Sequence, residues 1–410
     1  MCYNRRVSLK IQFINHACFH IIKEDYSILV DPWFYGKVFN DSWALIQETQ
    51  IDNLDLSKLK YIFISHEHPD HLHWLTLRQI KEKCEQKIQV LMAKRKNDNV
   101  KDMLLKLGYC FTQFEPYRFF NEPSDNFSFS FFKKNHDAAI VFKIDGKIIF
   151  NKNDCKFSES ELLGFKSMFG DNQIDFLFNQ FSLAGFYANK QESHQLHEAR
   201  NDHLADLVRS HNILKPKLTI PFASFITFCR PENIFLNNFV VSPLEVFDHT
   251  KELDFFVPFC MDIICSKGDK NLSESNANKW QNLFTQKKSF KQSVETISRK
   301  QLESSFYIMG EELRANNNHF IVSCPKEDFL LSVVDRGEYC KFNFFKNTID
   351  FLPPEQANDP PIGVLPSYDL NAYFKFPWGA DTLNITSCFE VFCKSMWKKM
   401  LIFKDSCYVR

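Results

Sequence analysis

The first part of the chain alternates short apolar runs with turn residues, a pattern typical of β-strands. The third run ends at Asp31-Pro32, because proline has no amide hydrogen to donate to a sheet. The pattern predicts strands at Ser8–Ile14, Cys18–Ile22 and Ser27–Val30. These strands would form the opening hairpins of a β-rich layer.

Helical spacing of apolar residues appears farther along and alternates with more strands. Gly108 follows one helical stretch and suits the position after a helix carboxyl end. Asp145-Gly146 is a strong turn signal between two apolar runs. The predicted helices are Leu75–Cys84, Asn97–Leu107 and Glu192–His211, and the predicted strands are Gln89–Ala93, Phe127–Phe131, Ala138–Ile144, Lys147–Phe150, Asp175–Phe181 and Lys215–Phe225. This alternation predicts an α/β fold in which helices cover a sandwich of sheets.

The character of the sequence changes near Pro258. We expect a large first domain at 1–258 and a smaller α+β domain at 259–410. Its expected elements are a linker or exposed helix at Ser266–Asn282, a helix at Gln281–Glu312, strands at His319–Ser323, Phe329–Val334 and Cys340–Phe345, a strand and turn at Phe374–Leu383, and a helix at Cys388–Met400. This second domain carries no catalytic motif, so we interpret it as a scaffold, a dimerisation domain or a pocket lid.

Composition narrows the partners and the compartment. The 410 residues include 50 Lys and Arg and 50 Asp and Glu, so zero net charge gives no reason to expect nucleic acid or an anionic membrane as a partner. The 13 cysteines form no Cys-x-x-Cys pair, which suits reduced thiols in a cytoplasmic protein. No apolar run is long enough for a signal peptide or a membrane span. We therefore expect a cytoplasmic protein.

The strongest chemical signal follows the apolar run Tyr61–Ile64. Three histidines and an aspartate stand there within six positions, namely His66, His68, Asp70 and His71. Imidazole is the commonest metal ligand in proteins, and carboxylate oxygen completes such sites. Side chains two positions apart in an extended segment project to the same side, so the first two histidines can share one ion. Asp70 and His71, which follow, can bind a second ion. The alternative to a metal site is a surface loop that happens to be rich in histidine.

The pattern His-x-His-x-Asp-His after a strand resembles the metallo-β-lactamase superfamily. More narrowly, the stretch from Asp31-Pro32 to Trp43 is similar to the metallo-β-lactamase-like part of the CMP-N-acetylneuraminate hydroxylases. The resemblance implies an αββα sandwich for the first domain. It also implies two divalent metal ions, iron or zinc, with Asp70 both a ligand and a catalytic group.

The resemblance implies further site residues. It carries a third histidine ligand onto His136 and a bridging carboxylate onto Asp154, after a predicted hairpin. The residues expected to line the substrate pocket are His16, Trp33, Tyr35 and Trp43. Hydrolase branches end a later strand in Pro-x-His, where this chain has Ala223. The group that would replace this histidine stays open between His20, Cys229 and His249.

Three functions compete. The first is a diiron oxygenase that hydroxylates a small polar or nucleotide-linked molecule. The resembled hydroxylases carry a Rieske iron–sulfur domain, but this sequence has no combined Cys-x-His…Cys-x-x-His set, so a separate protein would donate electrons. The second is a zinc-dependent hydrolase of a phosphodiester, lactone or amide. The third is a non-catalytic binding protein that kept the fold.

The predicted helix Glu192–His211 carries several histidines. We expect a solvent-exposed or lid-lining helix there, and a second metal site is the less favoured alternative.

Overall fold

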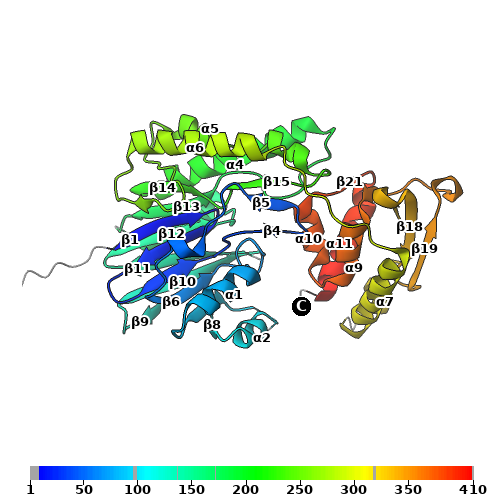
Figure 1. Ribbon diagram of the computed structural model, residues 1–410, viewed down its shortest axis with the longest axis horizontal. Coiled ribbons are helices and arrows are strands. Elements are labelled where there is room, and N and C mark those ends of the chain that lie inside the picture. The colour runs from blue at the N-terminus through cyan, green and yellow to red at the C-terminus, as the bar shows by residue number, and fades with distance from the viewer. Residues whose placement is uncertain (1–8, 96–98, 136, 171, 317–319, 409–410) are drawn as a thin grey trace, which may run out of the picture.

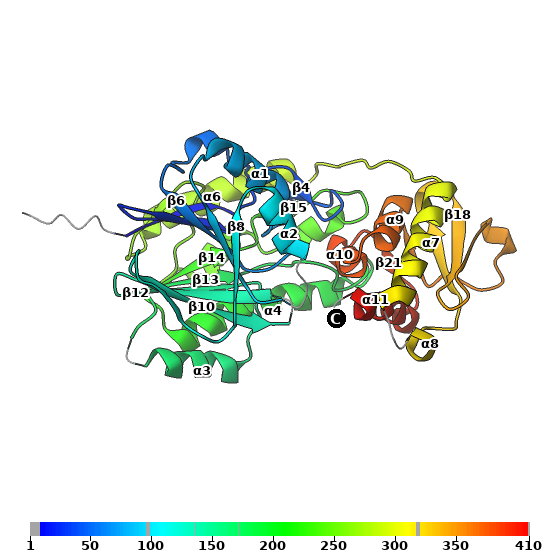
Figure 2. The ribbon, with the colours of Figure 1, turned by 90° about the horizontal axis from the view of Figure 1, so that it is seen from below.

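The computed structural model describes residues 9–95, 99–135, 137–170, 172–316 and 320–408 (Figure 1). Two large sheets lie face to face in the first part of the chain, and a smaller sheet with its own helices forms the second part. Figure 2 shows the same two parts from below, with the carboxyl-terminal helices between the large sheets and the small one.

The first large sheet has the strand order β16-β1-β2-β3-β6-β7-β8. Strands β1 to β3 pair antiparallel, and β3, β6, β7 and β8 run parallel. The bounds are β1 Lys10–Asn15, β2 Cys18–Ile22, β3 Ser27–Val30, β6 Leu59–Ile64, β7 Gln89–Ala93, β8 Cys110–Phe114 and β16 Ile263–Ile264. Apolar runs bounded by turn residues therefore become strands here as predicted for β1, β2, β3, β6 and β7, whereas β8 and β16 were not predicted.

The second large sheet has the order β14-β13-β12-β11-β10-β9, and a three-stranded sheet has the order β15-β5-β4. In the second large sheet the bounds are β9 Phe120–Glu122, β10 Phe127–Lys134, β11 Asp137–Ile144, β12 Lys147–Asn153, β13 Phe176–Gln180 and β14 Leu218–Phe222. In the small sheet they are β4 Lys37–Val38, β5 Trp43–Leu45 and β15 Ile226–Phe228. Strands β9 to β12 are antiparallel, whereas β12 to β14 are parallel.

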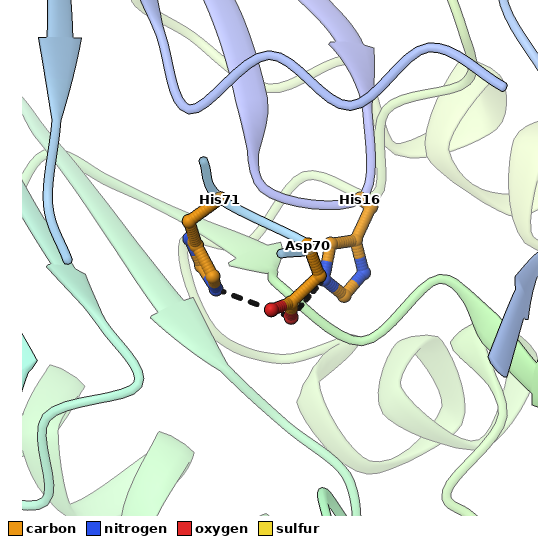
Figure 3. A group of neighbouring side chains, drawn as sticks. All are labelled: His16, Asp70 and His71. Carbon is orange, nitrogen blue, oxygen red and sulfur yellow. Dashed lines mark hydrogen bonds and ion pairs between the residues drawn. The ribbon is translucent and has the colours of Figure 1, made fainter. Parts of the chain in front are cut away.

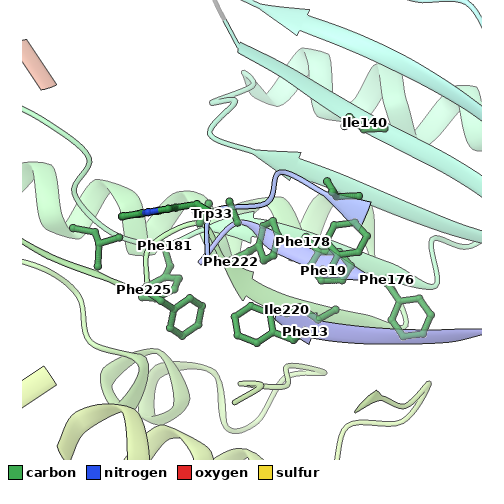
Figure 4. Close-up of a cluster of buried hydrophobic side chains, with 14 of the residues drawn as sticks. Phe13, Phe19, Trp33, Ile140, Phe176, Phe178, Phe181, Ile220, Phe222 and Phe225 are labelled. Carbon is green, nitrogen blue, oxygen red and sulfur yellow. The ribbon is translucent and has the colours of Figure 1, made fainter. Parts of the chain in front are cut away.

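Aromatic rings fill the space between the two large sheets (Figure 4). Phe19 on the first sheet stacks on Phe178 of the second with ring centroids 4.4 Å apart. Phe63 packs edge-on against Phe142 at 4.7 Å in the same layer. Ring pairs of this kind add to the free energy gained from burying apolar area.

Helices cover the outer faces of both sheets. Helices α1 (Trp74–Lys83) and α2 (Asn99–Lys106) pack on the first sheet, and α3 (Glu159–Phe169) and α4 (Ser193–Leu214) pack on the second. This gives the predicted αββα sandwich. No helix among the described residues is long and apolar enough to cross a membrane.

The sandwich extends beyond Pro258. Helices α5 (Pro243–Thr250) and α6 (Lys270–Lys287) pack together, and Trp280 of α6 is fully buried in the core of the first part. The next hydrophobic core begins at Ile297. We therefore propose that the boundary between the two domains lies at residues 285–296, between these two cores, rather than at residue 258.

The second part is built on a five-stranded sheet in the order β19-β18-β17-β20-β21. Its strands are β17 Phe329–Val333, β18 Glu338–Asn343, β19 Thr348–Leu352, β20 Gly363–Leu365 and β21 Glu390–Val391. Its helices are α7 Arg299–Asn316, α8 Phe320–Ser323, α9 Ser367–Lys375, α10 Gly379–Thr386 and α11 Lys394–Tyr408. Four short 3₁₀ helices, η1 Ile51–Asn53, η2 Ile234–Asn238, η3 Val334–Arg336 and η4 Pro354–Gln356, complete the described elements.

Three expectations for this second part are wrong. The helix expected at Gln281–Glu312 is two helices, because non-helical chain separates α6 from α7. The strand expected at His319–Ser323 is instead helix α8 in its described residues, and the strand expected at Phe374–Leu383 falls on α9 and α10. Short apolar runs fit a buried helix as well as a strand, so periodicity alone could not decide between them.

A buried ion pair joins the two parts. Arg230 and Asp369 are fully buried, and Nη2 of the arginine donates to a carboxylate oxygen at 3.0 Å. Asn40 donates to the other oxygen of Asp369 at 3.2 Å. Asn40 lies between Phe39 and Asp41, and all three residues have positive φ. This loop between β4 and β5, residues 39–41, therefore contacts the second part directly.

Candidate metal centre

The predicted ligands converge at one edge of the sandwich. The loop after β6 carries the histidine cluster, the turn between β1 and β2 carries His16, and the end of β12 leads to Asp154. Carboxyl ends of neighbouring parallel strands meet at one edge of a sheet, which is where ligands commonly bind. Figure 3 shows Asp70 between the rings of His16 and His71.

One group joins His66, His68 and Asp137. His66 Nε2 lies 2.8 Å from His68 Nδ1 and 3.5 Å from an oxygen of Asp137. The group thus contains two imidazoles and one carboxylate.

A second group forms around His71, whose side chain is completely buried. His71 Nε2 lies 3.1 Å from Oδ2 of Asp154 and 3.3 Å from Oδ2 of Asp70. His16 Nε2 approaches the same Asp70 oxygen at 3.2 Å. Oδ2 of Asp154 is also 3.7 Å from His66 Nε2, so this one oxygen lies between the two groups. A carboxylate in this position suits two neighbouring cations.

Asp31 orients the second group from behind. Its Oδ2 accepts from His71 Nδ1 at 3.0 Å and from Asn153 Nδ2 at 2.8 Å. The backbone amide of Ser65 donates to its other oxygen at 2.7 Å. A histidine whose Nδ1 is held by a carboxylate presents Nε2 to a metal, which is the usual arrangement around metal ligands.

The charges of the site perturb one another strongly. Burial lowers the pKa of His66 well below its usual value, and the neighbouring His71 lowers it further. Burial alone would raise the pKa of Asp70, but His71 and His16 hold it well below its usual range. Burial and the carboxylate of Asp154 raise the pKa of Asp137 to about 6. Crowded carboxylates of this kind favour a cation between them.

Two buried atoms of the site have no hydrogen-bond partner among the described residues. They are Oδ1 of Asp70 and Nδ1 of His16. A buried charged oxygen without a partner is strongly unfavourable in a folded protein. Imidazole and carboxylate groups are suitable ligands for divalent cations. A bound cation would also compensate the buried carboxylate of Asp70.

A cleft of about 390 Å³ opens over the first group. Its walls combine basic, amide and aromatic side chains with the carboxylates of the site. The lining residues outside the two metal groups include Phe39, Trp43, Lys134, Lys156, Gln180, Tyr187, His203, Asp381 and Ile385. The cleft therefore offers both cationic and apolar surface to a small molecule.

The predicted pocket residues are distributed differently from the ligands. Trp43 lines the cleft, and His16 belongs to the second metal group. Trp33 is fully buried, donates from Nε1 to the backbone oxygen of Tyr35 and packs against the His16 ring. Tyr35 itself packs edge-on against His73. Their contact with a substrate stays a prediction, and His136 lies outside the described residues.

Ala223 stands beside the second group with a positive φ of 50°. Its amide donates to the backbone oxygen of His16 at 2.9 Å, so the missing histidine would have entered next to this turn. In the described chain none of the residues left open for its place joins a metal group: His20, Cys229 and His249. His16 already supplies a nitrogen on this side.

The histidines of α4 show no metal group in the described chain. His194 is exposed, and His203 Nε2 lies 2.7 Å from the Tyr187 hydroxyl and 3.0 Å from the Lys156 ammonium. Burial lowers the pKa of His203 to about 3, so its ring is neutral and accepts from these donors. The helix lines the cleft through His203, and a role as part of a lid stays a prediction.

Two site residues were missed from the sequence. Asp137 follows His136 directly, and the resemblance directed attention to the histidine. Asp381 comes from α10 and accepts from His68 Nε2 at 2.8 Å. No local signal could have identified Asp381, because 313 positions separate the two residues.

Comparisons with known proteins agree with this geometry. Residues 10–155 match the family model described as a β-lactamase superfamily domain. The chain is 24% identical to the cytidine monophosphate-N-acetylneuraminic acid hydroxylase of Danio rerio over 260 residues, which cover 58% of this chain and 42% of that protein. It is 29% identical to the Xenopus laevis hydroxylase over 154 residues, covering 36% and 26%. The chain thus spans less than half the length of these relatives.

Solved structures with a similar arrangement include the metallo-β-lactamase fold protein YhfI from Bacillus subtilis, at 12% identity and a TM-score of 0.43, covering 63% of this chain and 100% of that one. CmlA, a diiron β-hydroxylase from Streptomyces venezuelae, matches at 12% identity and a TM-score of 0.40, covering 70% and 53%. The histidine cluster after β6 lies within the residues that match the family model. Residues 10–155, which form the first part of the sandwich, thus match a β-lactamase superfamily domain, and the chain is related in sequence to the cytidine monophosphate-N-acetylneuraminic acid hydroxylases.

Proposed function

We propose that this protein is a metal-dependent oxygenase with a dinuclear iron centre, which hydroxylates a small polar or nucleotide-linked molecule. The observation that carries the proposal is the group of His66, His68 and Asp137. Two histidines and one carboxylate are the ligand set typical of non-haem Fe(II) oxygenases. The second ion would be held by His71 and Asp70 with Asp154 between the two.

Each residue of the centre has a defined task in this proposal. Asp31 fixes the ring of His71, and Ser65 contacts His66 Nδ1 at 2.9 Å, so both rings present Nε2 to the centre. Asp154 is held in turn by Gln180, which donates to its outer oxygen at 3.0 Å. When bound, iron supplies the redox chemistry that dioxygen activation requires. The surrounding protein keeps the ligands at fixed positions.

The lining of the cleft supports a small polar substrate. Lys156 can face an anionic group, while Phe39 and Trp43 offer ring faces. The relatives are named as hydroxylases of cytidine monophosphate-N-acetylneuraminic acid, which is a nucleotide-linked molecule of this kind. We extend that substrate class to this chain as part of the proposal.

The reaction requires two electrons in addition to dioxygen. A C–H bond is converted to C–OH with one oxygen atom, and the second oxygen atom leaves as water after taking up two electrons and two protons. We propose that a separate electron-donor protein supplies the electrons.

A zinc-dependent hydrolase of a phosphodiester, lactone or amide is the second candidate. His16 favours this candidate, because its Nε2 lies beside Asp70 and can replace the nitrogen of the histidine that is absent at Ala223. With zinc in both groups, a bound water would ionise near neutral pH and attack the substrate. Two histidines and one carboxylate also occur in catalytic zinc sites, so the first group is compatible with this candidate as well.

Metal analysis after anaerobic purification tests the proposal. We expect about two iron ions per chain and a visible absorption band that changes when dioxygen is admitted. Tightly bound zinc without colour, together with hydrolysis of a model phosphodiester or lactone, would contradict it and support the second candidate. Asp137→His is an informative companion variant, because three histidines in the first group should shift metal preference from iron towards zinc.

A further inference from the structure

His68 connects the metal centre to the second part of the protein. Its Nδ1 faces His66 Nε2 at 2.8 Å, and its Nε2 lies 2.8 Å from an oxygen of Asp381 on α10. Helix α10 is the carboxyl-terminal helix nearest the sandwich in Figures 1 and 2. One imidazole therefore bridges a ligand group of the first part and a carboxylate of the second.

The two ring nitrogens of His68 have different tasks because of this contact. A carboxylate only accepts, so the hydrogen of the neutral ring must be on Nε2. The lone pair is then on Nδ1, which points at the first metal group. Metal-binding histidines are usually held by a second, outer carboxylate in this way.

Helix α10 is held firmly against the first part. Asn233 donates to the backbone oxygen of Thr386 at 2.8 Å, and the amide of Phe186 donates to the oxygen of Asn384 at 3.0 Å. Gly379 begins the helix so close to α9 that an added Cβ would lie 2.5 Å from a backbone oxygen of Ala372. These contacts fix the position of Asp381.

Phe39 holds the other side of the His68 ring. The two rings meet edge-on with centroids 5.8 Å apart, and Phe39 lies in the left-handed loop 39–41. The same loop reaches Asp369 of the second part through Asn40. The carboxyl-terminal part thus controls the ring directly through Asp381 and is linked to its neighbour Phe39.

We propose that Asp381 is a positioning residue of the metal centre, supplied by the carboxyl-terminal part, which fixes the tautomer and orientation of His68. The inference rests on the proposed dinuclear centre and adds to it. Residues 10–155, which match the superfamily domain, contain the ligands of the first group but not this outer carboxylate, which the second part supplies when it is docked.

Binding of Co²⁺ to the full chain tests this assignment, because Co²⁺ gives visible absorption bands that report ligand geometry. We expect Asp381→Ala to weaken binding of one of two ions by roughly 10- to 100-fold, which is the usual effect of losing such an outer carboxylate. Asp381→Asn should fall between wild type and Asp381→Ala, because its side-chain oxygen still accepts from Nε2. The band positions should change together with the affinity.

The matched control is Asp359→Asn, an exposed carboxylate of the second part, which should bind Co²⁺ like the wild type. If Asp381→Ala does not fold, Asp381→Asn carries the test alone. Wild-type affinity and spectrum in Asp381→Asn and Asp381→Ala would overturn the inference while leaving the centre intact. Absence of Co²⁺ binding by the wild type would overturn the proposed function itself.

Discussion

Both parts of the molecule have aromatic cores, but they differ in how their buried polar side chains are paired. The sandwich buries imidazoles and carboxylates at one edge, and two of their atoms, on Asp70 and His16, have no protein partner among the described residues. The core of the second part is built from packed rings, such as Phe342 between Phe306 and Phe329. Its buried Glu338 is paired with arginines. The second part thus pairs its buried Glu338, whereas the sandwich has buried polar atoms without a protein partner at its metal-binding edge.

Two carboxylates of the second part point towards the first part and show how the two parts are connected. Asp369 and Asp381 both contact the first part, one through a buried arginine and one through a histidine of the candidate metal centre. The second part therefore contributes to the site at the contact between the parts. The following predictions separate the chemistry of the first part from the docking of the second.

The largest expected effect is the loss of metal from His71→Ala. This fully buried ring joins Asp154 and Asp70 in the second group, so its removal should reduce bound metal from about two ions to one or fewer per chain. Elemental analysis of the purified variant measures this. His194→Ala, at an exposed position of α4, is the control and should retain full metal content. Full retention in His71→Ala would show that the second group is assigned wrongly.

Arg230→Met should break the docking of the second part. It leaves the carboxylate of Asp369 buried without its partner, which destabilises proteins by about 3–5 kcal/mol. Urea unfolding should show the loss, and the double variant Arg230→Met, Asp369→Leu should recover much of it. Arg299→Met, which removes a more exposed partner of Glu338, should have a much smaller effect. Equal losses in both single variants would contradict a special role for the contact between the parts.

Glu161→Gln gives the smallest effect and remains within the first part. The hydrogen bond from Lys134, together with that from the Ser158 amide at the start of α3, lowers the pKa of Glu161 to about 2. A depressed carboxyl pKa stabilises the fold above pH 4.5, and this stabilisation is lost as the pH falls towards 2. Because the pair is partly exposed, the variant should lose no more than about 1 kcal/mol at neutral pH.

Thermal unfolding at several pH values checks the Glu161→Gln prediction. The difference between wild type and variant should be present at pH 7 and vanish near pH 2. A difference that grows on acidification would have the wrong sign for a lowered carboxyl pKa. Metal content should not change, because Glu161 lies outside both metal groups.

The sequence was sufficient where the signal was local. Strands β2, β3 and β7 have the predicted bounds, because each is an apolar run ended by turn residues. The residues from His66 to His71 could be read as a metal cluster because they are contiguous. In the second part, short apolar runs near Phe320 and Phe374 belong to helices, and only packing against other elements decides this.

The remaining site residues depended on tertiary structure. Asp137 is the first residue of β11 and reaches His66 only because the second sheet lies opposite the first. Asp381 reaches His68 only after α10 docks on the sandwich. The place of the missing histidine at Ala223 also needed geometry, since His16 approaches from a different turn.

The loop of residues 39–41 has a consequence for how this chain can vary. Asn and Asp tolerate left-handed backbone, but for a phenylalanine such a conformation costs roughly 1–2 kcal/mol. The loop is retained in it because Phe39 contacts His68 while Asn40 contacts Asp369. An inserted or deleted residue would displace both contacts together. The length of the loop between β4 and β5 therefore determines two contacts at once. One is with His68 of the candidate metal centre, and the other is with Asp369, more than three hundred residues away in the sequence.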